Sequence, residues 1–144
     1  MASTTSIEDY KQIARQIPED VATEKKLDLI DDLQAENAVE NDTFTVHRGR
    51  EAIRDHLEGT FTSFPDLTAT VEQIIGEGDT VAMRVTLRGT HEGKFMGIEP
   101  TGREFEVQNM VFTRVDDEKI IERRIQPDVF GMLQQLGVTD QEVG

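Results

Sequence analysis

Histidine, asparagine, arginine and aspartate supply the side chains of this sequence that could bind a ligand or move a proton. The histidines are His47, His56 and His91, and their spacing matches no common metal-binding motif, so we expect surface or capping roles and no metal site. The chain contains no cysteine, which excludes thiolate ligands, cysteine nucleophiles and disulfide chemistry. Glycine-rich phosphate loops, HExxH and GxSxG are also missing, so any chemistry must come from less recognisable residues.

Two polar residues, Asn109 and Asp128, each allow a structural and a functional interpretation. Asn109 shares one face of a predicted strand with Phe105, Val107 and Val111. A buried amide must be hydrogen-bonded, so its partner is either a neighbouring side chain or a ligand. Asp128 precedes a predicted helix over residues 129–136 and fits its N-cap. In a hydrophobic pocket that raised its pKa, it would instead be a catalytic acid or base.

Arg123 is a cation in an apolar strand near the end of the sequence. By alternation, one face of this strand carries Ile121, Arg123 and Ile125, whereas Ile120 lies on the other. If the first face points inward, Arg123 is buried and needs a carboxylate partner or an anionic ligand. The alternative is a surface ion pair with Glu104 or Glu106.

Helices must position these residues from the first part of the chain, and strands from the rest. Ser6 and Asp9 have the spacing of a capping box, and a second helix is predicted over 49–64. From residue 67 the apolar period changes to two, which predicts strands near 67–75, 81–87, 105–111 and 120–125; residues 35–42 are ambiguous. We therefore expect one α+β domain over residues 1–144, with helices on one face of a curved antiparallel sheet.

Acidic residues dominate the charge, with 29 Asp and Glu against 15 Lys and Arg and a net charge of −14. A field of that sign repels nucleic acid and anionic membranes, so neither is expected as a partner. No apolar run approaches about 18 residues and the N-terminus lacks a basic, apolar leader, so we expect a cytoplasmic protein. Five lysines among so many acids are typical of a salt-loving organism, and an ordinary acidic protein is the alternative.

Four segments, taken in order, resemble a known family. They are GREAIRDHL (49–57), FTSFPDL (61–67), EGDTVAMRVTLRGTHEGKFMGIEPTGREFEV (77–107) and FGMLQQLG (130–137). Residues 49–137 are similar to the SnoaL-like polyketide cyclase (ester cyclase) family of the nuclear transport factor 2-like superfamily, and residues 1–48 match more loosely. The resemblance implies a cone-shaped α+β barrel that encloses an apolar pocket. It also implies ring closure by an aldol step without a cofactor, although relatives hydrolyse epoxides, isomerise steroids or only bind ligands and dimerise.

The family pattern IVEHWD in the last strand reads IIERRI here, so Arg123, Arg124 and Ile125 replace His, Trp and Asp. Val111 stands where the preceding strand commonly carries an acid or histidine, and Asp128 is the surviving acid.

We expect a small apolar or carbonyl-bearing ligand in the pocket, and a homodimer through the outer sheet face. The pocket is expected to be lined by Val81, Met83, Val85, Phe105, Val107, Asn109, Val111, Arg123 and Ile125. Two functions are expected as alternatives. One is a cofactor-independent cyclase, isomerase or lyase with Asp128 as acid or base, and the other is a non-catalytic ligand-binding or dimerisation module.

The halophile interpretation predicts that salt stabilises the protein. Molar KCl screens repulsion between like charges, because the Debye length falls to about 3 Å at 1 M. The thermal midpoint should therefore rise strongly from low-salt buffer to molar KCl in differential scanning calorimetry. An unchanged midpoint contradicts the interpretation.

Overall fold

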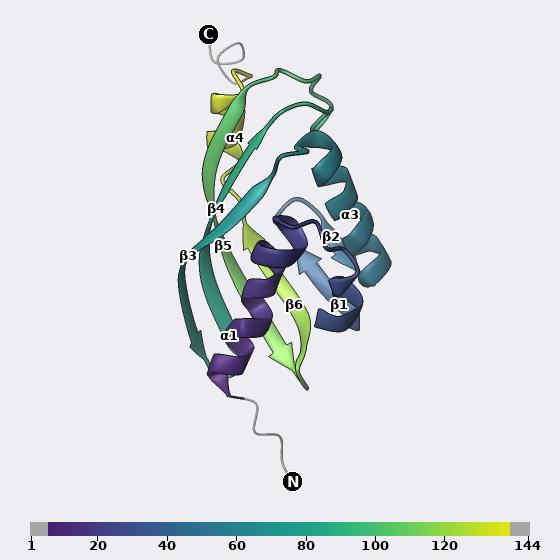
Figure 1. Cartoon of the computed structure of the whole chain (residues 1–144), viewed down its shortest axis with the longest axis vertical. Helices are drawn as coiled ribbons and strands as arrows, with labels where there is room; N and C mark the ends of the chain where they lie inside the picture. The colour runs from purple at the N-terminus through teal and green to yellow at the C-terminus, as the bar shows by residue number, and fades with distance from the viewer. Residues whose placement is uncertain (1–5, 139–144) are drawn as a thin grey trace.

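The computed structural model describes residues 6–138, in which helices lie against one face of a curved sheet (Figure 1). The helical segments are α1 (Ile7–Gln16), the π-helical turn η1 (Ile17–Ala22), α2 (Leu29–Leu33), α3 (Arg50–Ser63) and α4 (Val129–Gln135). The strands are β1 (Gln34–Asn41), β2 (Val46–Arg48), β3 (Thr68–Glu77), β4 (Thr80–Thr90), β5 (Glu104–Asp116) and β6 (Lys119–Gln126). The expected α+β fold class is confirmed.

The sheet has the strand order β2-β1-β6-β5-β4-β3 and stays open, with β2 and β3 at its edges. Neighbouring strands are antiparallel except β1 and β6, which run parallel. The expectation of an antiparallel sheet is therefore wrong at this pair. A hairpin turn forces antiparallel pairing, but β1 and β6 are joined by most of the chain and are free of that constraint.

Local sequence signals account for the helix ends. The Ser6 hydroxyl accepts from the Asp9 N–H and the Asp9 carboxylate accepts from the Ser6 N–H, which confirms the predicted capping box. Pro18 is the second residue of η1, and the Thr23 N–H donates to the Pro18 carbonyl at 3.2 Å, a bond that spans five residues. Gly49 precedes α3 with a φ of +88°, a left-handed conformation that favours glycine.

Two groups of helices bury different parts of the concave face. α1 and η1 pack over β3 and β4, whereas α3 packs over β1 and β2 (Figure 1). Ala14 of α1 is fully buried, and its small side chain allows α1 to approach Val81, Met83 and Val111 closely. None of the helices within residues 6–138 is long and apolar enough to cross a membrane.

A β-bulge in β6 changes which side chains face the core. Arg114 pairs with Glu122 and Val115 pairs with Ile120, so Ile121 is an extra residue on β6. Ile120 is consequently fully buried, whereas Ile121 is partly exposed. The predicted alternation is wrong for these two isoleucines, which exchange faces. It is correct for Arg123 and Ile125, because both lie beyond the bulge on the inner face.

Candidate functional site

A row of polar side chains crosses the inner face of the sheet. Backbone pairing places His47 of β2 beside Glu40 of β1, Glu40 beside Arg123 of β6, and Arg123 beside Thr113 of β5. Apolar core residues continue the row, beginning with Val81 of β4 opposite Thr113. The inner face is therefore polar toward the β2 edge and apolar toward the β3 edge.

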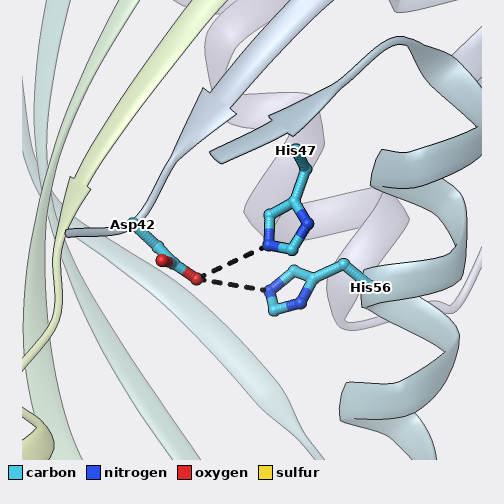
Figure 2. A group of neighbouring side chains, drawn as sticks. All are labelled: Asp42, His47 and His56. Carbon is cyan, nitrogen blue, oxygen red and sulfur yellow. Dashed lines mark ion pairs between the residues drawn. The ribbon is translucent and has the colours of Figure 1, made fainter. Parts of the chain in front are cut away.

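Asp42, His47 and His56 converge at the polar end of this face, and Figure 2 shows their side chains pointing toward one another. The Nε2 atoms of His47 and His56 each lie 3.8 Å from Asp42 Oδ2. The two imidazole rings are stacked, with centroids 4.1 Å apart and planes inclined by 23°. The side chains are 18%, 19% and 35% exposed for Asp42, His47 and His56, so a ligand can reach them from solvent.

The loop between β1 and β2 holds the Asp42 carboxylate in place. Asp42 Oδ1 accepts the backbone N–H groups of Thr45 at 2.9 Å and Phe44 at 3.2 Å, and it also contacts the Thr45 hydroxyl at 3.2 Å. These bonds form the turn that returns the chain to β2, and they leave Oδ2 directed at the histidines. The third member, His56, comes from α3, whose buried residues Ile53 and Leu57 fix the helix against the sheet.

Burial and hydrogen bonding set the charges in this group. Burial disfavours the charged Asp42 carboxylate, but the Thr45 and Phe44 hydrogen bonds outweigh it and lower the pKa of Asp42. Burial also lowers the pKa of His56, and the nearby His47 lowers it further against the opposing effect of Glu40 and Asp42. Asp42 is therefore ionised at neutral pH, and His56 is uncharged with one ring nitrogen free to accept a proton.

Arg123 is a buried cation, and its partner is a carboxylate. Arg123 Nη1 lies 2.6 Å from Glu40 Oε2, with the two side chains 9% and 3% exposed. The alternative of a surface pair with Glu104 or Glu106 is wrong, since Glu106 pairs with Arg88 at 2.7 Å on the outer surface. Within residues 6–138, Arg123 Nε and Thr113 Oγ1 are buried without a hydrogen-bond partner.

Asn109 and Asp128 contact each other rather than the histidines. Asn109 Oδ1 accepts the backbone N–H of Asp128 at 3.2 Å, so the amide oxygen has a main-chain partner. The Asp128 carboxylate accepts the Gly131 N–H at 2.9 Å and caps α4, which confirms the N-cap interpretation. Asp128 is exposed.

The expected apolar lining faces inward and is buried. Val81, Met83, Val85 and Val111 pack with Ala14 of α1, and Ile125 packs against them. Phe105 and Val107 of β5 join a second group with Phe64, which follows α3, and Met132 of α4. The interior that these residues form adjoins the polar row at Thr113.

The spatial grouping of the histidines with Asp42 was not predicted from the sequence. His47 and His56 were expected at the surface, yet they are half-buried beside Asp42. His91, for which a surface or capping role is expected, is fully buried, and its Nδ1 accepts the Thr101 N–H at 3.2 Å. The alternation of Ala38, Glu40 and Asp42 could have indicated that Asp42 faces inward. It could not be used, because the sequence leaves it ambiguous whether this segment is a strand.

Removing Arg123 should destabilise the fold because it leaves the Glu40 carboxylate buried and unpaired. Arg123→Met is expected to lower the free energy of unfolding by about 3–5 kcal/mol. Arg88→Met, which breaks the exposed pair with Glu106, should cost less than about 1 kcal/mol. Urea denaturation followed by circular dichroism measures the free energy of unfolding of both variants. Equal losses would contradict a larger contribution of the buried pair to stability.

Comparison with known proteins assigns the chain to a family. Residues 12–136 match the model of SnoaL-like polyketide cyclase. Nogalonic acid methyl ester cyclase of Streptomyces nogalater is 32% identical over 93 residues, which span 64% of this chain and 69% of that protein. Aklanonic acid methyl ester cyclase AcmA of Streptomyces galilaeus is 34% identical over 95 residues, spanning 65% of this chain and 66% of that protein.

Solved structures share the fold over nearly the whole chain. A SnoaL-like polyketide cyclase candidate from Jannaschia sp. CCS1 superposes with a TM-score of 0.85 at 20% identity, covering 94% of this chain and 96% of that one. IdmH, a candidate polyketide cyclase from Streptomyces antibioticus, superposes with a TM-score of 0.78 at 35% identity, covering 90% of this chain and 99% of that one. On the match over residues 12–136 and this shared architecture, the chain belongs to the SnoaL-like polyketide cyclase family.

Proposed function

We propose that the chain binds a small, largely apolar, carbonyl-bearing molecule against the concave sheet face and closes a ring in it by proton transfer. The observation that carries this proposal is the convergence of Asp42, His47 and His56 at the polar end of an otherwise apolar interior. A ring-closing base must lie within reach of the substrate while the rest of the substrate is held by apolar contacts. The relatives named as methyl ester cyclases support this reaction class.

The proposed reaction is an intramolecular aldol addition, which is redox-neutral. A base removes a proton from the carbon beside one carbonyl of the substrate, and that carbon bonds to a second carbonyl carbon. The C=O of the second carbonyl becomes an alkoxide, which takes up a proton and ends as a hydroxyl. One proton leaves carbon and one arrives at oxygen, so a single acid–base group can serve both steps in turn.

The base is best supplied by the group formed by Asp42, His47 and His56, which we call the Asp42 group. Its Nε2 and Oδ2 atoms are directed into one space, whereas the Asp128 carboxylate is exposed and hydrogen-bonded at the start of α4. Asp128 remains the acid–base residue that the family pattern favours, so the two candidates are tested against each other. Arg123 would act as a positioning residue, because its charge is already neutralised by Glu40.

Asp42→Asn and Asp128→Asn separate the two candidates with minimal change of shape. Removing the base should lower kcat/KM by at least about 100-fold. We expect this loss for Asp42→Asn and little change for Asp128→Asn. Chromatography of the products of a polyketide methyl ester, such as nogalonic acid methyl ester, measures the rate.

Asp55→Asn, an exposed change on α3, controls for the loss of one negative charge. The reverse ranking would assign the reaction to Asp128. If the wild-type protein binds such esters in isothermal titration calorimetry without turning any of them over, the chain is a non-catalytic ligand-binding module and the cyclase proposal is wrong.

The outer face of the sheet favours a second copy of the chain as partner. Ile75, Ala82 and Phe112 are register neighbours across β3, β4 and β5, and Met110 lies on the same face of β5. Ile75, Met110 and Phe112 are 59%, 47% and 55% exposed. Large apolar side chains grouped on an exposed face are typical of an interface. We include a homodimer through this face in the proposal.

Phe112→Glu should disrupt such a dimer by placing a charge at its centre. Light scattering coupled to size exclusion in molar KCl should show a dimer for the wild-type protein and a monomer for this variant. Phe130→Glu, at a residue that is 62% exposed but lies on α4, should remain a dimer. A monomeric wild-type protein contradicts the homodimer.

A further inference from the structure

We propose that the Asp42 group binds a divalent transition-metal ion such as Zn²⁺, Co²⁺ or Ni²⁺, through Asp42 Oδ2 and the Nε2 atoms of His47 and His56. The three ligand atoms lie within 4.8 Å of one another. Tetrahedral coordination with bonds of about 2.0–2.2 Å separates ligand atoms by about 3.3–3.6 Å. The 3.8 Å distances from Oδ2 to each Nε2 are therefore about 0.2–0.5 Å wider than the bound geometry requires.

The side chains are already arranged as a metal site would need them. The Nε2 atom is a common metal-binding atom of histidine, and both Nε2 atoms lie 3.8 Å from the same carboxylate oxygen (Figure 2). His47 Nε2 also lies 3.1 Å from the Thr45 hydroxyl, a contact that the metal ion would replace. The other Asp42 oxygen is held by the Thr45 and Phe44 N–H groups, which orient the ligand carboxylate. Binding then costs small side-chain movements rather than a rearrangement of the backbone.

Charge favours a cation at this position. Glu40 pairs with Arg123, whereas the ionised Asp42 carboxylate has no lysine or arginine partner among residues 6–138. The whole chain has a net charge of −14. A field of that sign raises the local concentration of cations. Two imidazole ligands select transition metals, because Mg²⁺ and Ca²⁺ prefer oxygen ligands.

Metal binding at the Asp42 group would regulate ring closure, a consequence that rests on the proposed function. A ring nitrogen or carboxylate oxygen that coordinates a metal cannot accept a proton from a substrate at the same time. Metal binding would therefore inhibit ring closure by competing with the proton for the same electron pairs. Three protein ligands also leave at least one coordination position for water or a substrate oxygen.

Metal binding is measured on the whole protein without any substrate. Isothermal titration calorimetry with ZnCl₂ should show one ion per chain, and CoCl₂ should give the visible absorption bands of tetrahedral cobalt. His47→Gln, His56→Gln and Asp42→Asn should each weaken Zn²⁺ binding by about 100-fold or more. Asp55→Asn, which removes an equal charge one residue from His56, should bind like the wild-type protein.

Circular dichroism and thermal melting confirm that each variant is folded, and MgCl₂ serves as the control ion. Zn²⁺ binding that is absent from the wild-type protein, or unchanged in both histidine variants, overturns the proposal. The result does not depend on turnover, so the metal site can stand even if the cyclase proposal fails. Where turnover is found, inhibition at the Zn²⁺ concentration that half-saturates binding supports the competition, and full activity of the saturated protein contradicts it.

Discussion

The ion pair between Glu40 and Arg123 joins the two strands on which the polar half of the interior depends. Burying two charges is costly, and their attraction compensates for it only when the geometry is good. The 2.6 Å contact between directly paired residues provides that geometry across β1 and β6. If β1 slipped by one residue, its inward-facing residues would turn outward and Arg123 would lose its partner. The pair therefore favours one register for the parallel junction, and that register positions the strand from which Asp42 follows.

Local signals of the sequence were sufficient to predict much of the fold. The Ser6–Asp9 capping box and the Asp128 cap depend on residues three positions apart, so their partners are fixed by the sequence itself. Alternation along β4 and β5 depends on the extended backbone alone, and there the apolar residues expected to face inward are buried. These features need no knowledge of distant parts of the chain.

Features that depend on distant segments could not be predicted in the same way. The bulge at Ile121 lies where β6 pairs with both β1 and β5. The residue types of β6 alone do not indicate it. His47 lies on β2 and His56 on α3, and the chain reverses between these two elements so that the side chains meet. Their spacing of nine residues matches the period of neither a helix nor a strand. The parallel pairing of β1 with β6 likewise cannot be predicted from the sequence of either strand alone. The candidate site was therefore harder to predict than the fold that holds it.

Among residues 6–138, the open sheet leaves β3, ten residues long, with one side unpaired by another strand. Such an edge is a template on which a second chain could add a strand and begin aggregation. The register of β3 shifts between Val71 and Gln73, so Glu72 interrupts the regular series of hydrogen-bonding groups. The Glu72 carboxylate is also held by the Thr86 hydroxyl at 2.8 Å, and Glu77 adds a second negative charge to the strand. The irregular hydrogen-bonding pattern and the like charges together disfavour pairing of this edge with the same edge of another copy. They therefore oppose aggregation at high protein concentration.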